Sequence, residues 1–236
     1  NDADKTAATL LSHMRSEGIE PEIKLLPHAS LGNIGSDKFL VIEDPDNHDY
    51  ILSTKLLTTF PGSRLKPNRN LVTRFKRSYV SETRPLNLAD ATVRRTLTDF
   101  FLAWANRKNL PVASVKNEYR AMSQALELST TKPLLGLGVF VDGSLVGFTI
   151  SERLHGTHGM LHFEKGDPTR CVGIYQFLMQ ETAKALSETG CELLNYQQDL
   201  GLQGLKTCKR GFHPSHYLRK YRVAWIGDRI RDTLAP

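Results

Sequence analysis

The sequence predicts an α+β protein in which a mixed sheet is flanked by helices. Two long segments, 87–109 and 115–128, repeat apolar residues at the spacing of amphipathic helices. After Pro133 the pattern changes to the two-residue period of strands, with the turn pair Asp142-Gly143 between two apolar runs. A third helical pattern covers 172–189 and has strand patterns on both sides. Periodicity alone therefore gives the class, and other mixed-sheet folds remain open at this point.

The composition bounds the kind of protein. Of 236 residues, 40% are hydrophobic and 24% are charged, which excludes collagen-like, low-complexity and wholly disordered chains. The longest apolar run, 134–141, is far shorter than the roughly 20 residues of a membrane span. Asp2, Asp4 and Lys5 interrupt any hydrophobic leader. Three cysteines without metal-ligand spacing favour a reducing compartment.

From these features we expect a cytoplasmic protein. Two variants of this expectation stay open: a position at the inner face of the membrane, or membership in a longer membrane protein, since the sequence starts at Asn1 without a methionine.

The N-terminal part predicts short elements. Ala7, Leu10, Leu11 and Met14 recur at helical spacing, so we expect a helix over 4–17, ended by Gly18. The other elements predicted here are strands over 22–26, 38–43 and 49–53 and a short helix over 54–60.

A short basic helix is predicted next, over 68–79. Leu71, Phe75 and Tyr79 lie four residues apart and form one apolar stripe. The cationic residues fall largely on the remaining surface: Arg69, Arg74, Lys76 and Arg77. The sequence thus predicts a docked helix that presents a cationic face.

The second part of the chain carries the longer elements. Leu97, Phe100, Phe101 and Trp104 face inward from the helix over 87–109. The predicted elements that follow are a helix over 115–128, a hairpin of 135–141 and 145–151, a strand over 157–165, a helix over 172–189, a strand over 191–196, a helix over 202–210 and a strand over 217–225. This order is that of the GNAT acyltransferase fold.

The positive charge is concentrated in two segments. Residues 64–84 carry seven Lys or Arg against one acid, and residues 206–222 carry six with no acid, whereas the whole chain has a net charge of +6. Such segments suggest a surface that faces a polyanion, either RNA or anionic lipid or a phosphorylated cofactor. The plain alternative is a solvated basic surface without a partner.

A set of short motifs resembles one family. They are 162–166 (HFEKG), 173–176 (GIYQ), 195–201 (NYQQDLG), 204–209 (GLKTCK), 213–214 (HP) and 220–221 (KY), preceded by matching residues between 49 and 76. Together they resemble the phosphatidylglycerol lysyltransferase C-terminal domain family, in its branch of uncharacterised soluble members, over roughly 49–222.

The resemblance implies a tandem GNAT arrangement. It would consist of a partial N-terminal half, 1–83, that ends in a basic linker helix at about 68–79, and a C-terminal GNAT-like domain, 84–236. Characterised relatives move an aminoacyl group from aminoacyl-tRNA to the headgroup hydroxyl of phosphatidylglycerol, and Fem-type aminoacyltransferases share the architecture. Two departures stand out: Gln197 replaces a common Glu, and the first half is short.

The GNAT sheet splays after its fourth strand, here 157–165, and donor and acceptor meet there. CoA-dependent members usually carry Gln/Arg-x-x-Gly-x-Gly/Ala in the next turn to hold pyrophosphate. This chain has Arg170-x-x-Gly173-Ile174, which lacks the second small residue. The partial match weakens the prediction of a CoA thioester donor and favours aminoacyl-tRNA.

Three residues near the splay are candidate catalytic groups. Glu164 could act as a base or orient the acceptor, or form a salt bridge with Lys165 or Arg170. Asp199 could orient the acceptor, or cap a helix that starts near residue 200, or both. Gln198 could donate to the carbonyl oxygen, or be solvated at the strand end.

Further residues are candidates for binding the donor or substrate. Lys206 and Lys209 share a helix face and could bind phosphate, or form an exposed basic face. His213 could shuttle a proton, but its sequence context favours a turn. Tyr196 is expected in the core or at the rim. The remaining binding candidates are Arg69, Arg74, Lys76, Lys165, Arg170, Gly173, Tyr175 and Asn195.

Other chemistry finds less support in the sequence. His155, His158 and His162 lie close together, but no carboxylate or cysteine completes a zinc set at standard spacing, so we expect no metal. There is no Gly-x-Ser-x-Gly motif and no cysteine with a visible histidine partner, which argues against a covalent intermediate.

Three hypotheses follow. The first is an aminoacyl- or acyltransferase with tRNA, anionic phospholipid or both as partners, acting at a membrane surface and not on DNA. The second is a non-catalytic RNA- or lipid-binding module. The third is a CoA-dependent N-acetyltransferase.

Overall fold

The chain forms two compact units, and neither is continuous in sequence. The computed structural model describes residues 3–32, 34–35 and 37–228. Unit 1 comprises Asn1–Tyr50, Gln198–Thr207 and His216–Pro236, and unit 2 comprises Ile51–Gln197 and Cys208–Ser215. The predicted division into an N-terminal half, 1–83, and a C-terminal domain, 84–236, stays a prediction.

Unit 1 is built around a small antiparallel sheet with the strand order β1-β10-β2. One face of this sheet is covered by the first helix, α1, whose Ala7 and Leu11 pack with Phe39 and Val223. The elements are α1 (Ala3–Ser16), β1 (Glu22–Pro27), the 3-10 turns His28–Ser30 and Pro45–Asn47, β2 (Phe39–Glu43), β9 (His216–Leu218) and β10 (Lys220–Trp225).

The last strand is the central strand of that sheet, which the sequence does not predict. The expected single strand over 217–225 is wrong, because the chain leaves the ladder at Arg219, between β9 and β10. The carbonyl oxygen of Arg219 instead accepts a hydrogen bond from the backbone N–H of His28 at 3.0 Å. The C-terminal strand thereby joins N-terminal strands in one unit.

Unit 2 contains the larger, mixed sheet, in which neighbouring strands follow the order β4-β5-β6-β7-β8-β3. All of the pairs described are antiparallel except β7 with β8, which is parallel. The strands are β3 (Asp49–Ser53), β4 (Ser81–Leu86), β5 (Leu134–Val141), β6 (Ser144–Arg153), β7 (His158–Gly166) and β8 (Leu193–Asn195).

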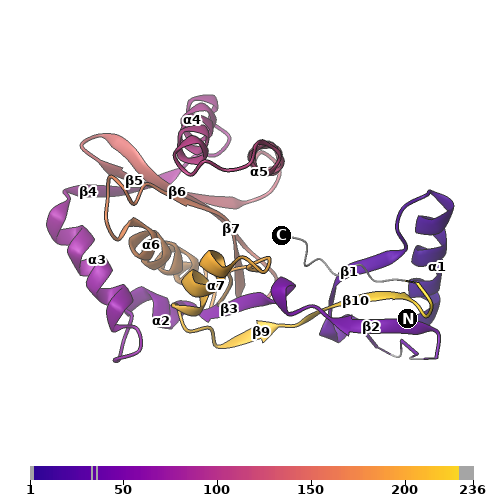
Figure 1. Cartoon of the computed structure of the whole chain (residues 1–236). Helices are drawn as coiled ribbons and strands as arrows, with labels where there is room; N and C mark the ends of the chain where they lie inside the picture. Colours follow the sequence, from indigo (N-terminus) through magenta and orange to yellow (C-terminus); the bar gives the residue numbers. More distant parts are fainter. Residues whose placement is uncertain (1–2, 33, 36, 229–236) are drawn as a thin grey trace. The chain divides into compact units, whose positions relative to one another are not determined.

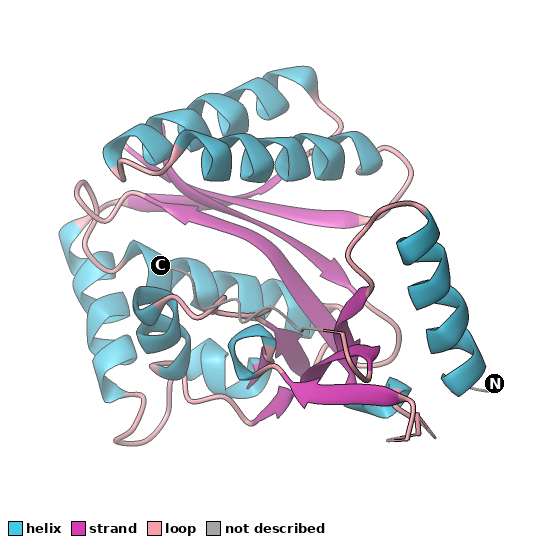
Figure 2. Cartoon of the chain, turned by 45° about the vertical axis from the view of Figure 1, so that its right-hand side comes forward, coloured by secondary structure: helices cyan, strands magenta, loops and turns pink. Residues whose placement is uncertain are grey.

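Helices cover both faces of this sheet (Figure 1). The two helices of one face, α4 (Ala91–Arg107) and α5 (Val112–Leu128), lie side by side over the strands (Figure 2). The other face carries α6 (Ile174–Glu188), against which α2 (Thr54–Thr59) and α3 (Lys66–Ser78) pack. The predicted α+β class with a helix-flanked mixed sheet is confirmed. Helix α7 (Gln203–Arg210) completes the elements.

Alternation along β6 explains why both faces are covered. Phe148 and Ile150 join the core formed with α4 and α5. Thr149 points to the opposite face, where its hydroxyl lies 2.8 Å from that of Thr182 on α6. A strand that is apolar on one side and small or hydroxylated on the other therefore packs between two helical layers.

Strand β4 was not predicted from the sequence, which treats 80–86 as a connection. Glu82, Arg84 and Pro85 are poor strand residues, but β4 lies at the edge of the sheet, where proline and charge are tolerated. The next helix therefore starts later than expected. Asp90 Oδ1 accepts from the N–H groups of Thr92 and Val93 at 2.7 and 3.0 Å, which fixes the start of α4 at Ala91.

The hairpin prediction is confirmed. Asp142 and Gly143 both have positive φ, at 50° and 72°, as the tight two-residue turn requires. Among residues 3–32, 34–35 and 37–228, none of the helices has the length and apolar character needed to span a bilayer.

Candidate functional site

The sheet of unit 2 forks between β7 and β8. The parallel pairing runs from His158 with Leu193 to Met160 with Asn195 and stops there. Strand β7 continues to Gly166, whereas β8 ends at Asn195. The predicted splay after this strand is therefore confirmed. Glu164 pairs with Thr149 of β6 but lies on the part of β7 that has no partner in β8.

Two amide side chains shape the fork. Asn195 Oδ1 accepts from the backbone N–H of Gln197 at 2.7 Å and so supports the positive φ of 58° at that residue. Gln197 Nε2 donates to the carbonyl oxygen of Leu161 at 2.6 Å, just beyond the last paired residue of β7. A glutamate could not donate this bond. The departure from the family pattern at Gln197 thus has a structural function here.

The Glu164 carboxyl group is held on one side only. Its Oε2 accepts a hydrogen bond from the Tyr196 hydroxyl at 2.6 Å. Its Oε1 is buried, and no residue in the described part of the chain donates to it. Burial raises the pKa of Glu164 to about 7, although the Tyr196 hydrogen bond and the charges of Lys209 and Lys165 act in the opposite direction.

Lys209 supports this pair from the next helix. Its ammonium donates to the carbonyl oxygen of Tyr196 and lies 4.1 Å from the centre of the Tyr196 ring. The residue is only 8% exposed, so the expected exposed basic face is wrong for this lysine. Burial and the Glu164 charge raise the pKa of Tyr196 well above its usual value, which keeps its hydroxyl protonated as a donor.

Lys165 and Tyr175 are held by other partners. Lys165 Nζ donates to Glu118 Oε1 at 2.6 Å and lies 4.3 Å from the Trp104 ring centre. The Tyr175 hydroxyl donates to the carbonyl oxygen of Gly166 at 3.1 Å and accepts from Trp104 Nε1 at 3.0 Å. These contacts fix the carboxyl end of β7 between α4, α5 and α6.

Asp199, in unit 1, is engaged at both of its oxygens. Oδ2 accepts from the hydroxyl of Tyr50, and Oδ1 accepts from the N–H of Gly201 at 2.9 Å. The side chain is almost fully buried, with 2% exposed. The expected helix cap is wrong, because α7 begins only at Gln203 and Asp199 instead closes the turn before it.

Lys206 and Gln198 also belong to unit 1. Lys206 Nζ forms an ion pair with Asp46 at 3.0 Å, and Gln198 is half-buried. Glu164 belongs to unit 2, whereas Asp199 belongs to unit 1. The catalytic roles of Asp199 and Gln198 stay predictions.

Helix α3 buries a different face from the one predicted. Asn68, Val72 and Phe75 are buried, whereas Leu71 and Tyr79 are only half-buried. The predicted Leu71–Phe75–Tyr79 stripe is therefore shifted by part of a turn. The shift is explained by a hydrogen bond: Asn68 Nδ2 donates to the carbonyl oxygen of Gly211 at 2.7 Å, which turns Asn68 inward. The spacing of hydrophobic residues cannot reveal this interaction.

Two of the predicted binding cations on α3 have internal partners. Arg69 donates to the carbonyl oxygens of Phe60 and Gly62 at the end of α2. Lys76 Nζ donates to Gln180 Oε1 at 2.9 Å, and burial lowers its pKa.

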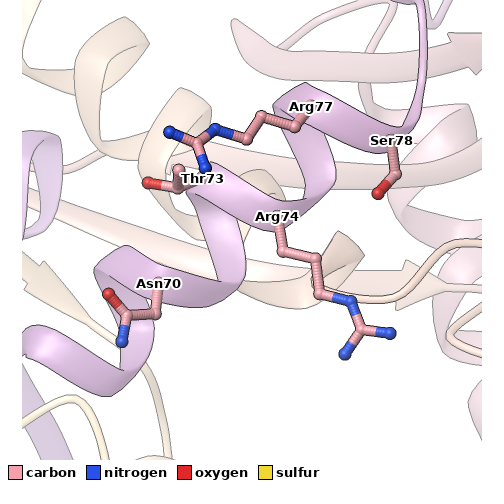
Figure 3. Close-up of a pocket in the computed structure, with 5 residues that line it drawn as sticks. All are labelled: Asn70, Thr73, Arg74, Arg77 and Ser78. Atoms are coloured by element: carbon pink, nitrogen blue, oxygen red, sulfur yellow. The ribbon is translucent and has the colours of Figure 1, made fainter.

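The outward face of α3 carries two further cationic residues, Arg74 and Arg77. Figure 3 shows Arg74 and Arg77 extending from the helix to either side of a shallow pocket. The pocket is completed by short polar side chains, those of Asn70, Thr73 and Ser78. Arg77, which was not among the predicted binding residues, belongs with Arg74 in this surface, which we call the α3 face.

The last predicted residues lie in turns. Arg170 is exposed, and Gly173 is the N-cap residue directly before α6, with a φ of 87°. His213 is exposed in the turn after α7, where its N–H donates to the carbonyl oxygen of Arg210 at 2.9 Å. Within the described ranges, no group of three or more His, Cys, Asp or Glu side chains could hold a metal ion.

Tyr196 is the residue that sequence reasoning underrated. Alternation assigns it to the core, and it is buried, but its hydroxyl contacts the candidate base. The signal available in the sequence was its place as the last residue of the predicted strand, 191–196, beside the fork.

Comparison with known proteins gives a family and a fold. The sequence matches the family described as phosphatidylglycerol lysyltransferase, C-terminal, over residues 17–224. The comparison with curated proteins gives no match.

Several solved structures are similar. A conserved protein of unknown function from Bacteroides thetaiotaomicron is 24% identical with a TM-score of 0.81, covering 95% of this chain and 76% of that one. The C-terminal domain of a putative lysylphosphatidylglycerol synthetase from Agrobacterium fabrum is 12% identical with a TM-score of 0.69, covering 94% and 72%. L-PGS from Bacillus licheniformis is 13% identical with a TM-score of 0.65, covering 96% and 73%.

A tandem GNAT protein from the clavulanic acid biosynthesis pathway has a TM-score of 0.51 at 10% identity, covering 96% of this chain and 70% of that one. At these identities the likeness shows the fold alone, and it confirms the predicted GNAT-like architecture, including the tandem type.

Proposed function

The chain belongs to the phosphatidylglycerol lysyltransferase C-terminal family, and on that premise we propose that it is an aminoacyltransferase. The donor is aminoacyl-tRNA, and the acceptor is the headgroup hydroxyl of an anionic phospholipid or another small hydroxyl or amine. The family and fold support a transferase or acyltransferase; the donor and acceptor are our proposal.

The state of Glu164 carries this proposal. An acceptor hydroxyl or amine must lose a proton as it attacks a carbonyl, and a general base works best when its pKa is near the working pH. Glu164 has a pKa of about 7 and lies on the part of β7 that has no partner in β8, and its Oε1 has no donor among the described residues. One oxygen is thus held by Tyr196, whereas the buried Oε1 keeps its lone pairs for a proton.

The transfer is direct. The acceptor oxygen or nitrogen attacks the carbonyl carbon of the aminoacyl ester, and the ester bond to the ribose oxygen of the tRNA breaks. Glu164 Oε1 takes the acceptor proton and returns it to the leaving ribose oxygen. Tyr196 and Lys209 hold the carboxyl group in place throughout.

The α3 face supports binding of a polyanion. Arg74 and Arg77 lie three residues apart on a helix that contains no acidic residue, and short polar side chains lie between them. Guanidinium groups in this arrangement suit phosphodiester oxygens. We assign this face to tRNA or to anionic lipid.

The test is a transfer assay with labelled aminoacyl-tRNAs and vesicles that contain phosphatidylglycerol. We expect label in the lipid fraction with the wild-type protein. If label stays on the RNA with lipid, amine and alcohol acceptors alike, while RNA or anionic vesicles still bind, the chain is a non-catalytic binding module. If label instead moves from acetyl-CoA to an amine, the enzyme is a CoA-dependent acetyltransferase.

The α3 face is tested separately by charge reversal. Arg74→Glu with Arg77→Glu should weaken tRNA or anionic-vesicle binding and lower the slope of log affinity against log salt by roughly two, since each lost phosphate contact removes about 0.7–0.9. Lys116→Glu with Arg120→Glu, on exposed positions of α5, makes the same charge change elsewhere in unit 2. Equal losses in both variants would show that only net charge matters.

A further inference from the structure

The turn between β7 and α6, residues 167–173, holds a second feature that bears on the donor. In CoA-dependent enzymes of the GNAT fold, backbone N–H groups of this turn bind the pyrophosphate of the cofactor. A helix start with free N–H groups suits such an anion. In this chain, however, most N–H groups of the turn already have acceptors within the protein: those of Asp167, Thr169, Arg170, Cys171 and Val172.

Asp167 provides most of these acceptors. Its Oδ1 accepts from the Thr169 hydroxyl at 2.6 Å and from the N–H groups of Thr169 and Arg170 at 3.2 and 3.3 Å. Its carbonyl oxygen accepts from the N–H of Cys171 at 2.9 Å. A single residue thus engages three consecutive N–H groups, as a bound phosphate oxygen would.

Asp167 is also a buried anion in this turn. It is 9% exposed, and its Oδ2 lies 3.3 Å from a guanidinium nitrogen of Arg107. Burial acts to raise the pKa of Asp167, but the hydrogen bonds from Thr169 and Arg170 and the Arg107 charge outweigh it, and the pKa is lowered. The carboxylate is therefore ionised at neutral pH and would repel a pyrophosphate placed beside it.

Tyr79 provides the next acceptor. The N–H of Val172 donates to the Tyr79 hydroxyl oxygen at 3.2 Å. Tyr79 follows directly after α3, and its ring packs against Phe75 with the centres 5.2 Å apart. The hydroxyl is thus delivered to the turn by the same helix that carries the α3 face.

The backbone of α3 also approaches the turn closely. Gly173 has a φ of 87°, and a Cβ atom there would overlap the carbonyl oxygen of Leu71. The space next to the start of α6 is therefore filled by a neighbouring helix, and the negative end of a peptide carbonyl lies there.

We propose that the turn between β7 and α6 is a phosphate cradle that the chain fills itself, and that Asp167 and Tyr79 thereby exclude CoA thioesters as donors. The carboxylate and the hydroxyl occupy the N–H groups that a pyrophosphate would need. This inference concerns donor specificity and holds whether or not the chain transfers aminoacyl groups. It makes Asp167 and Tyr79 specificity-determining residues.

The test measures binding of CoA and of inorganic pyrophosphate by calorimetry, without any transfer reaction. Wild type should bind neither in the micromolar range. Asp167→Ala with Tyr79→Phe frees the N–H groups of Thr169, Arg170 and Val172 and removes the charge. It should bind both ligands at least about tenfold more tightly, because one net hydrogen bond corresponds to roughly that factor.

A matched control frees N–H groups at another helix start. Asp90→Ala releases the N–H groups of Thr92 and Val93 at the start of α4 and should leave CoA binding as weak as in wild type. If Asp167→Ala does not fold, Asp167→Asn with Tyr79→Phe keeps the shape and removes the charge, and a smaller gain is expected.

Two results would overturn the inference. One is micromolar binding of CoA by the wild-type protein. The other is a folded Asp167 and Tyr79 variant that binds CoA no more tightly than the Asp90→Ala control. Neither result depends on whether aminoacyl transfer is observed, so this inference and the proposed function fail separately.

Discussion

Two buried carboxyl groups near strand ends, Glu164 and Asp199, look alike in the sequence but differ in how the protein holds them. Both oxygens of Asp199 accept a hydrogen bond, one from the Tyr50 hydroxyl and the other from the N–H of Gly201. Glu164 has one oxygen on the Tyr196 hydroxyl and one buried oxygen to which no described residue donates. The first arrangement stabilises a turn, and the second raises the pKa of a carboxyl group to about 7.

This difference shows that position along a strand is a weak guide to chemistry. A carboxylate that accepts a hydrogen bond at each of its two oxygens is a structural anchor, because the protein replaces water as its donor. A buried carboxyl group with too few donors has its proton affinity raised toward neutrality, which suits a base. The following predictions test whether the two residues really divide in this way.

The largest expected effect is on transfer by Glu164→Gln. Glutamine keeps the size and still accepts from Tyr196, but it cannot take a proton, so the rate should fall by about 10²–10⁴. The measurement is single-turnover transfer with saturating substrates. The matched control is Glu152→Gln, on the neighbouring strand β6, where the carboxylate pairs with His162 at 3.0 Å. Equal activity of Glu164→Gln and wild type would remove Glu164 from the mechanism.

The second prediction concerns stability against pH. The pKa of Glu164 rises from 4.5 to about 7 on folding, so the folded state binds the extra proton. The stabilisation from that proton is fully present below about pH 4.5 and is lost as pH rises through about 7; the loss totals roughly 3 kcal/mol.

Glu164→Gln cannot lose this proton and isolates the effect. The difference in unfolding free energy between the variant and wild type should grow between pH 5 and pH 8, in favour of the variant. Denaturant unfolding at several pH values measures it. A difference that does not change with pH would show that Glu164 titrates normally.

Much of the fold could be predicted from the sequence because its signals are local. Helical spacing found the long helices, and Asp142-Gly143 found the hairpin, since a turn with two positive φ angles leaves a local signature. Strand β4 was not predicted because Pro85 and two charged residues are untypical of strands, and its partner, β5, lies far along the chain. The division of 216–225 between two strands escaped for the same reason.

The candidate site was predictable only in part. The fork and Glu164 follow from strand order, which patterns can suggest. The partners of Glu164 depend on where β8 stops and on which side α7 packs, and both are set by long-range contacts. Likewise, no spacing rule shows that Asn68 donates a hydrogen bond to the carbonyl oxygen of Gly211, or that Arg69 donates to that of Phe60. The sequence therefore predicted Arg69 as a binding residue, whereas the α3 face carries Arg77.

The third prediction is that Asp199 contributes to the stability of the fold. Asp199→Asn keeps only one side-chain acceptor for two donors, so unfolding free energy should fall by about 1–3 kcal/mol. Tyr50→Phe removes the donor of the same hydrogen bond and should lower the unfolding free energy by a similar amount. The double variant should lose less than the sum of the two single losses. Thermal and denaturant unfolding test both.

A transfer assay separates this from a catalytic role. If Asp199 orients the acceptor, as its sequence position suggests, Asp199→Asn loses activity while Tyr50→Phe retains it. If it only anchors the turn, both variants lose stability together and keep most of their activity at low temperature.

The smallest effect is expected from Tyr196→Phe, which removes the hydroxyl that donates to Glu164. That hydrogen bond lowers the pKa of Glu164, so its loss should move the pH–rate midpoint upward and reduce the rate at neutral pH by about tenfold. Tyr119→Phe, whose ring on α5 lies near Phe101, is the control and should leave the profile in place. The rate of Tyr196→Phe should recover at higher pH, which separates an effect on the pKa of Glu164 from general damage to the fork. A uniform loss of rate at every pH would contradict this prediction.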